Sequence, residues 1–199
     1  QMLLSSKPKQ QHLDQQATLN QAVGTRVRIY GKALVGGTRA FWDARNNMLY
    51  QAIVVASGRI DGYQEWWLGD EAVSAMNGEG GGMSISGRSA GYVSFEPHLG
   101  YSSQGRSDVL RAYFGDVWFE EHNLHGLAYV VVVFHPPRQK DFNSRFPQSY
   151  QTNVRFLVRG ALVWNPTDPS QNPEDENTWT WNENAAACIL DYLRHPDGM

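Results

Sequence analysis

The sequence has little that could support disulfide, metal-cluster or membrane chemistry. Its 199 residues include a single cysteine, Cys188, which excludes an internal disulfide, a cysteine-rich zinc site and an iron–sulfur cluster. A lone cysteine also mildly favours a reducing compartment. No apolar run reaches the roughly 18 residues of a membrane-spanning helix. The first residues lack the charged and apolar regions of a signal peptide. We therefore expect no membrane span.

Charge is also scarce. Charged residues make up 19% of the chain, against a usual value of roughly 25%. The formal net charge is -3 and the isoelectric point is about 6.1. Nucleic-acid-binding domains usually lie above about pI 9, so no specific nucleic-acid partner is expected. A hydrophobic content of 41% also argues against a disordered chain.

The composition changes near residue 24. Residues 1–23 are rich in glutamine and show no helical or strand period, which predicts an extended arm or linker. Residues 24–199 have the length of one domain and a β-like pattern, with room for an inserted subdomain around residues 72–122. Because the last residues end abruptly, we expect the chain to be a piece of a longer protein.

Apolar patterning predicts strands through the first two thirds of this domain. Residues 27–35 alternate between apolar and polar side chains, as in a half-buried strand. Residues 49–56 and 127–134 are almost continuously apolar, as in strands covered on both faces, and the second run is the strongest candidate for a central strand. Asp61-Gly62 is a hairpin-turn signal, with residues 63–68 as the returning strand.

The last third adds one more strand and the clearest helix. Residues 154–158 alternate again, Leu162 and Trp164 continue the same phase, and Gly160 between them predicts a bulge or bend. Asn184 is a helix N-cap residue before residues 185–195. Ala185, Ile189, Tyr192 and Leu193 lie on one side of this helix, with Cys188 beside them.

A second, shorter helix is predicted over residues 107–114, where Ser107 can accept a hydrogen bond from a free backbone N–H at the helix start. Strands predominate and no βαβ alternation is present. The predicted fold is therefore mainly β, an antiparallel barrel or sandwich with one or two short peripheral helices.

Motifs for catalysis or cofactor binding are missing. The glycine run at residues 78–82 does not continue into a phosphate-binding motif, so we interpret it as a flexible loop. His122 and His125 follow two glutamates without the HExxH order of a zinc site and are interpreted as turn residues. Cys188 lies in an apolar, alanine-rich helix and is interpreted as a packed side chain. We predict no catalytic, cofactor-binding or metal-binding residue, and no enzyme.

An alternative remains open for the acidic and aromatic residues. Glycoside hydrolysis needs two carboxylates across a cleft, and the chain has seven tryptophans that could line a sugar groove. The alternative function is therefore a carbohydrate-binding or cell-wall-degrading module. Its candidate carboxylates are Asp61, Glu65, Asp70, Glu71, Glu120 and Glu121.

Two pairs of adjacent aromatic residues, Phe41-Trp42 and Trp66-Trp67, lie in predicted strands. Neighbours in a strand point to opposite faces, so a sheet with a single core cannot bury both rings of a pair. Either a second layer of the same chain covers the outer rings or a partner protein does. These four residues are the candidate interface.

Five runs together resemble the tail-tip attachment proteins of bacteriophages, of the lambda protein J type, and the related tail proteins of gene transfer agents. The order and spacing agree over roughly residues 24–199. Thr167, in place of the family's arginine, and Ala185, in place of its proline, depart from the pattern at surface turns. The runs are RVRIYGKALVGG (26–37), LYQAIVVA and GRIDGYQEWWLGDE (49–71), LHGLAYVVV (124–132), VRGALVWNP (158–166) and WNENAAACILDYL (181–193).

The resemblance implies a structural role in the virion. Such proteins form a trimeric central hub that closes the tail, next to the distal tail protein and the end of the tape-measure protein. They are assembled in the cytoplasm of the host bacterium, and regions beyond this chain would contact the bacterial surface receptor. The resemblance thus implies tail assembly and host attachment, without a reaction or a cofactor.

Overall fold

The computed structural model describes residues 26–77, 83–149 and 152–195. The expected N-terminal arm (1–23) and the glycine run (78–82) lie outside the described residues. Within the described ranges, no helix has both the length and the apolar character needed to cross a lipid bilayer.

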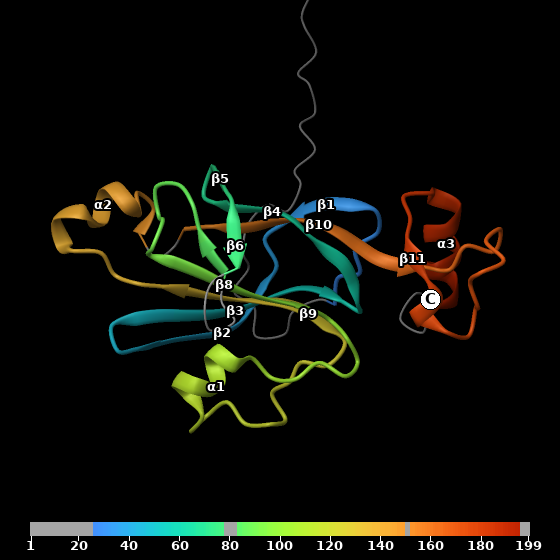
Figure 1. Cartoon of the computed structure of the whole chain (residues 1–199), viewed down its shortest axis with the longest axis horizontal. Helices are drawn as coiled ribbons and strands as arrows, with labels where there is room; N and C mark the ends of the chain where they lie inside the picture. The colour runs from blue at the N-terminus through green and yellow to red at the C-terminus, as the bar shows by residue number, and fades with distance from the viewer. Residues whose placement is uncertain (1–25, 78–82, 150–151, 196–199) are drawn as a thin grey trace, which may run out of the picture.

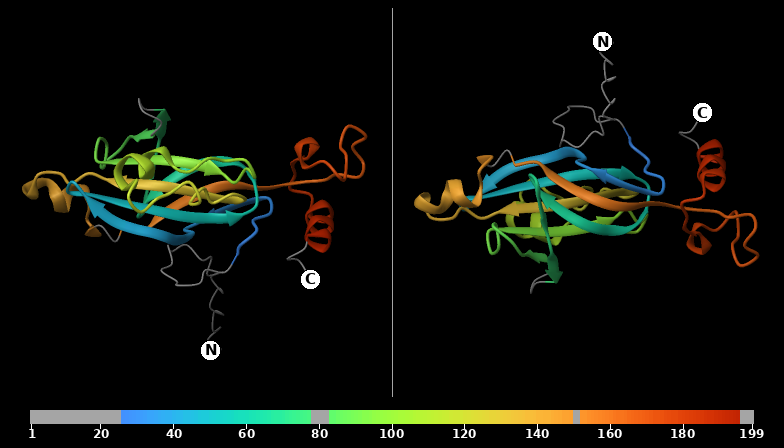
Figure 2. Two further views of the ribbon diagram at one scale, coloured as in Figure 1. Left: turned by 90° about the horizontal axis from the view of Figure 1, so that it is seen from below. Right: turned by 90° about the horizontal axis from the view of Figure 1, so that it is seen from above.

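Two antiparallel sheets pack face to face (Figures 1 and 2). One has the strand order β1-β10-β4-β5, with β11 pairing to the end of β10, and the other has the order β2-β3-β9-β8-β7-β6. The predicted mainly β, antiparallel fold is confirmed as a sandwich. The strands are β1 (Lys32–Val35), β2 (Thr38–Arg45), β3 (Met48–Ser57), β4 (Ile60–Leu68), β5 (Glu71–Val73), β6 (Ala75–Asn77), β7 (Met83–Ile85), β8 (Val93–Leu99), β9 (Leu127–Phe134), β10 (Val154–Val163) and β11 (Thr180–Trp181).

Helices lie outside the sheets. The N-caps of the first and last α-helices are those predicted: Ser107 accepts from the backbone N–H of Leu110, and Asn184 accepts from that of Ala186. One turn of helix follows β9 at Phe142–Arg145. The helices are α1 (Asp108–Phe114), α2 (Phe142–Arg145) and α3 (Ala185–Arg194), with 3-10 turns at Gln139–Asp141 and Glu176–Thr178.

β9 is the central strand of its sheet, as predicted, and lies between β3 and β8. Its β-branched residues suit a strand, and the two-residue period divides its continuous apolar run between two cores. Ala128, Val130, Val132 and Phe134 face the other sheet and form part of the inter-sheet core. Tyr129, Val131 and Val133 face the opposite way.

This opposite face of β9 is covered by α1 and the turn that follows it. Leu110 and Phe114 of α1 and Trp118 pack on Tyr50, Ala52, Tyr129 and Val131 to form a helix-side core. Figure 1 shows α1 against this sheet, on the side away from β10. The β9 sheet is therefore a middle layer, and this explains why its apolar runs lack the polar alternation of a half-exposed strand.

The predicted hairpin at Asp61-Gly62 is wrong. Both residues lie inside β4, where Gly62 pairs with Arg159 of β10, and the chain turns earlier, at Gly58-Arg59, where Gly58 has a φ of +83°. The turn also joins different sheets, since β3 pairs with β2 and β9 whereas β4 pairs with β10 and β5. A two-residue signal cannot show whether the returning strand pairs with the strand before it.

Residues 72–122, where an inserted subdomain was expected, contribute to both sheets. They complete β5, which pairs with β4, and supply β6, β7 and β8, which extend the β9 sheet. They also supply α1. The strand predicted from residue 27 begins later, at Lys32, because residues 27–31 cross the end of the sandwich and bond to other segments there.

β10 links the sandwich to a distal lobe, which we define as residues 161–195. Val154, Phe156 and Val158 lie in the inter-sheet core as predicted. Beyond Gly160 the buried face changes: Ala161 and Val163 pack with Ala187 of α3, whereas Leu162 stays half-buried. Figure 2 shows β10 continuing past the sheets toward α3.

Gly160 marks a close backbone contact. The sequence predicted a bulge or bend at this residue, and the bulge is wrong. The irregularity in the β10 register lies between Leu157 and Val158. A Cβ at Gly160 would lie 2.1 Å from the carbonyl oxygen of Ile29. Ala161 N–H donates to that same oxygen at 2.7 Å, so only glycine lets the two backbones approach this closely.

Candidate functional site

Several distant segments meet where the sandwich joins the distal lobe. Ser57 N–H donates to the carbonyl of Val27 at 2.7 Å, Gly58 N–H donates to that of Gly126 at 2.6 Å, and Gly160 N–H donates to that of Gly31 at 2.8 Å. We call this region the junction (residues 27–31, 57–58, 126, 160–161 and 191). It connects the start of the described chain to both sheets and to α3.

A buried carboxylate anchors α3 at the junction. The Asp191 side chain is 6% exposed. It accepts from Arg28 Nε at 2.9 Å and from the Tyr30 hydroxyl at 2.8 Å. Burial and the hydrogen bond to Asp191 raise the pKa of Tyr30 to about 12, so this hydroxyl stays protonated at neutral pH and donates to the carboxylate. Arg28 supplies the positive charge that a buried carboxylate needs.

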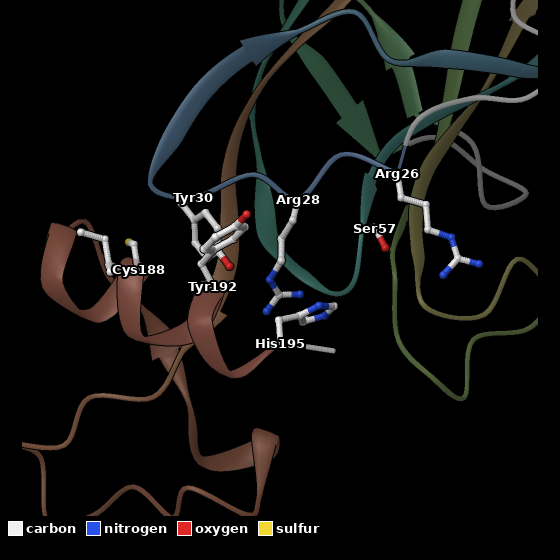
Figure 3. Close-up of a pocket in the computed structure, with 8 residues that line it drawn as sticks. Arg26, Arg28, Tyr30, Ser57, Cys188, Tyr192 and His195 are labelled. Atoms are coloured by element: carbon white, nitrogen blue, oxygen red, sulfur yellow. The ribbon is translucent and has the colours of Figure 1, made fainter. Parts of the chain in front are cut away.

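Beside this anchor lies a hollow of about 460 Å³, which we call the α3 hollow. In Figure 3, Arg28 is drawn between the rings of Tyr30 and Tyr192 on one side and Arg26 on the other. The size is within the range of roughly 300–1,000 Å³ found for small-molecule sites. The lining residues are Arg26, Arg28, Tyr30, Ser57, Cys188, Ile189, Tyr192 and His195.

The helix that borders this hollow presents apolar side chains to solvent. Ile189 is 59% exposed, and Tyr192 and Leu193 are each 49% exposed, whereas Ala187 and Asp191 are the buried residues of α3. A surface helix normally packs its apolar side on the core and exposes its polar side. In α3 the charged Asp191 is buried instead, because its carboxylate pairs with Arg28, and the large apolar side chains are exposed. The α3 surface is therefore an exposed apolar patch beside a cavity.

Cys188 lies in the wall of the α3 hollow and is partly buried. Its Sγ is 3.6 Å from the carbonyl oxygen of Asn182. Burial raises the pKa of the Cys188 thiol, and the charge of Asp191 acts in the same direction. A protonated thiol is a weak nucleophile at neutral pH, so this geometry does not activate the sulfur.

The aromatic pair in β2 divides between the two faces of its sheet. Phe41 packs on α1 and the following turn, with ring centroids 5.1 Å from Phe114 and 5.3 Å from Trp118. Trp42 is 44% exposed, and the guanidinium of Arg39 lies 4.0 Å from its ring centroid. The chain itself thus covers Phe41, whereas Trp42 remains accessible.

The pair in β4 divides in the same way. Trp66 is 7% exposed and lies in the inter-sheet core, stacked on Tyr63 and Phe95. Trp67 is partly exposed, and its indole N–H donates to Glu65 at 3.1 Å. Of the four candidate interface residues, Trp42 and Trp67 are thus the ones whose rings point outward, and an interface through them stays a prediction.

The candidate carboxylates for glycan chemistry belong to separate interactions. Asp70 and Glu71 are the exception, because they share the wall of a second hollow, of about 610 Å³, with Arg88 and Arg145. Asp61 and Glu65 both lie on β4, and Glu120 and Glu121 are neighbours in the turn after α1. The partners are Arg159 for Asp61, Trp67 for Glu65, Arg155 for Asp70, Arg88 for Glu71 and Arg106 for Glu120.

The histidine pair lies in the turn before β9. His122 Nδ1 accepts from the backbone N–H of Phe119 at 2.9 Å, and its ring stacks on Trp118. His125 N–H donates to the Asn123 side chain. In the part of the chain that the structure describes, no group of three or more histidine, cysteine or acidic side chains could hold a metal ion.

The anchor and the α3 hollow were missed by sequence reasoning. Arg28 and Asp191 are 163 positions apart, and no local pattern pairs them. The available signal was Asp191 itself: a carboxylate inside an otherwise apolar helix needs a partner if it is buried. The arginines of the early strand-like segment were the available counterions.

Comparisons with known proteins were made at the levels of family, sequence and structure. No protein-family model and no curated protein sequence matches the chain. Among solved structures, a chain in the virion of a native gene transfer agent particle superposes with a TM-score of 0.48 and 17% identity. The match covers 86% of this chain and 33% of that chain, so the present chain spans about a third of its length.

Proposed function

We propose that this chain is a structural subunit of a bacteriophage-type tail tip, part of the central hub that closes the tail. In this role it forms a homotrimer next to the distal tail protein and the tape-measure protein. It is assembled in the host cytoplasm, and regions outside this chain contact the bacterial receptor. The observation that carries the proposal is the set of five ordered runs that resemble tail-tip attachment proteins.

The positions of these runs in the fold support treating them as one unit. The run at 26–37 provides Arg28, and the run at 181–193 provides Asp191, which bind each other. The run at 49–71 provides Gly58, which donates to Gly126 of the run at 124–132. The run at 158–166 provides Gly160, which donates to Gly31. All five runs therefore meet at the junction, although they are spread along the sequence.

The architecture also suits a load-bearing role. The sandwich has apolar cores on both sides of the β9 sheet, and such close-packed interiors are stiff. The apolar surface of α3 and the adjacent hollow offer a contact area for neighbouring subunits.

The direct test is the location of the chain in particles. Purified particles from the organism that encodes it are labelled with an antibody against residues 24–199 and imaged by electron microscopy. We expect label at the end of the tail distant from the capsid, and peptides of the chain in digests of purified tails. Label on the capsid, or absence of the chain from particles, would contradict the proposal.

A glycan test addresses the alternative of a carbohydrate-binding or wall-degrading module. The chain is incubated with purified cell-wall glycan, and both binding and soluble products are measured. The hub proposal predicts neither. Product release that is lost in Glu71→Gln, beside the second hollow, would favour the degrading module, and binding without products would favour the carbohydrate-binding module.

A further inference from the structure

The exposed large apolar residues are concentrated at two places. Nine such residues occur in the described part of the chain. Two of them, Trp42 and Tyr101, each have a guanidinium on one ring face, from Arg39 at 4.0 Å and from Arg59 at 4.3 Å. The remaining seven form two groups: Val27, Ile189, Tyr192 and Leu193 near the α3 hollow, and Tyr113, Val117 and Phe119 at the end of α1 and in the turn after it.

The second group ends in a turn that carries an exposed aromatic residue. Phe119 is 50% exposed although its neighbour Trp118 is buried, and Phe119 N–H bonds to His122, which closes the turn. We call residues 119–122 the Phe119 turn. It places an aromatic ring next to two carboxylates. Glu120 pairs with Arg106 at 2.8 Å, whereas Glu121 has no ion-pair partner among the residues that the structure describes.

The α3 hollow has the complementary character. Its walls include the apolar side chains of Ile189 and Tyr192. Two arginines, Arg26 and Arg28, line it, and one carboxylate, Asp191, lies behind it and binds Arg28, so these three groups together carry one net positive charge. The cavity is thus apolar inside with a positive border, and its volume of about 460 Å³ accommodates a phenyl ring.

We propose that the Phe119 turn of one copy of this chain inserts into the α3 hollow of a second copy. Phe119 enters the apolar part of the hollow, and Glu121 meets its positive border. The occupant is another copy because the same chain carries both surfaces at different places, with α1 against the β9 sheet and α3 at the end of the molecule (Figure 1).

Charge favours this unlike pairing over self-pairing of either surface. Two α3 hollows facing each other would bring together the arginines of both copies, and two Phe119 turns would bring together their glutamates. Like charges in an interface cost free energy, whereas opposite charges set the orientation of the partners. Contact between two different surfaces is a heterologous interface, which closes into a ring when the rotation allows it.

This contact would join the subunits of the proposed tail hub. The number of copies in the ring, three, rests on the proposed function. The existence of the contact rests on the two surfaces alone. Solution mass therefore tests the contact, whereas labelling of particles tests the function.

The experiment uses the full 199-residue chain and two variants, Phe119→Asp and Tyr192→Asp, in sedimentation velocity over a range of concentrations. The first variant removes the inserting ring and keeps the hollow, and the second does the reverse. We expect each variant to raise the dissociation constant at least roughly 30-fold, as for a central interface residue. Tyr101→Ser, at an exposed aromatic residue outside both groups, is the matched control and keeps the wild-type mass.

Mixing the two variants separates this contact from every other mode of assembly. Each variant retains one intact surface, so a one-to-one mixture should form a heterodimer and stop there, whereas the wild type continues to a ring. Unchanged circular dichroism and unfolding midpoints establish that the variants fold. Glu121→Lys should weaken wild-type association roughly two- to fivefold at low salt.

Three results would overturn the contact: a wild type that stays monomeric up to its solubility limit, variants that associate as the wild type does, or a mixture without heterodimer. If the chain is found at the tail tip but is monomeric, and Phe119→Asp still assembles into tails, the contact is wrong and the function stands. If the variants behave as expected but the chain is absent from tails, the function is wrong and the contact stands.

Discussion

The sandwich and the distal lobe are stabilised in different ways. The sandwich buries long apolar side chains on both sides of its β9 sheet. In the lobe, Ala161, Val163 and Ala187 form the buried cluster, with Tyr30 against it, and a charged pair between Arg28 and Asp191 supplies the other main contact. Apolar burial contributes in proportion to area, so the sandwich supplies most of the folding free energy and the lobe is attached by few, specific contacts.

Among the residues that the structure describes, the sandwich and the lobe each contain one buried carboxylate, and the two carboxylates have different roles. Glu96 of β8 accepts from Ser107 and from the backbone N–H of Asp108 at 2.8 Å, so it completes the N-terminal cap of α1 inside the sandwich. Asp191 instead connects two segments that share no sheet. The Glu96 cap supports α1, which is also held by apolar packing. The Asp191 anchor is one of the few contacts that hold α3 on the rest of the molecule.

The largest effect is expected in the sandwich. Val131→Asp places a carboxylate in the helix-side core, where Val131 is 0% exposed. An unpaired buried charge costs several kcal/mol, so we expect a loss of more than about 4 kcal/mol out of a total of roughly 5–15. Denaturant unfolding measures it. Val27→Asp, at a residue 46% exposed, is the control, and equal stability of the two variants would show that β9 is not central.

The boundary between the two regions should be the next most sensitive position. Gly160→Ala places a Cβ 2.1 Å from the carbonyl oxygen of Ile29, and backbone must move to admit it. Overpacking of this kind costs about 1–3 kcal/mol. Gly62→Ala is the matched control, since Gly62 lies in the neighbouring strand β4 with open space around it. If thermal unfolding gives the two variants the same midpoint, the close contact is absent.

Within the lobe, Asp191→Asn removes the charge and keeps the size of the side chain. A hydrogen bond to a charged group contributes roughly 1.5–3 kcal/mol, so we expect the opening free energy of α3 to fall by about that amount. Hydrogen exchange should show faster exchange in α3 and unchanged protection of β9. The control is Asp70→Asn, at a side chain that is 95% exposed. It should change neither the exchange rate in α3 nor the protection of β9. Loss of protection throughout the chain would mean that the lobe and the sandwich unfold together.

The smallest effect concerns pH and the α1 cap. Burial alone would raise the pKa of Glu96, but hydrogen bonds from Ser107 and the Asp108 backbone, together with the His98 imidazole at 3.5 Å, outweigh it and hold the pKa below the ordinary value of 4.5. The stability that Glu96 contributes is therefore complete above that value and is lost as pH falls through the lower pKa of the folded chain. We expect exchange in α1 to accelerate in that range, and Glu96→Gln to flatten this part of the profile. If Glu96→Gln and the wild type show the same pH dependence of exchange in α1, groups other than Glu96 cause the acceleration.

Local chemistry made the elements predictable. The β-branched run of β9, the Ser107 cap and the Asn184 cap are each specified by neighbouring residues, and each is found as expected. The division of the aromatic pairs between two faces also follows from the strand period alone: Trp66 is buried and Trp67 is partly exposed. These features need no knowledge of which strands are neighbours in space.

The sheet partners and the site could not be obtained in this way. Asp61-Gly62 has the composition of a turn but lies within β4, because pairing with β10 overrides local preference. The change of buried face after Gly160 depends on α3, which lies more than twenty residues further along the chain. The Arg28–Asp191 pair depends on both ends of the domain meeting. These features depend on tertiary contacts and therefore produce no periodic pattern in the sequence.

β10 is one continuous strand, and its last three residues, 161–163, lie in the distal lobe, which has fewer stabilising contacts than the sandwich. A pull on α3 is transmitted along this strand into the sandwich, where β1 and β4 flank it on either side. Tension along a strand loads its lateral hydrogen bonds together in shear, so the sandwich resists as a unit, and the hydrogen bond from Ala161 to Ile29 and the Arg28–Asp191 pair hold the lobe at the end of this strand. A force on α3 is therefore carried by β10 to the strands on both sides of it.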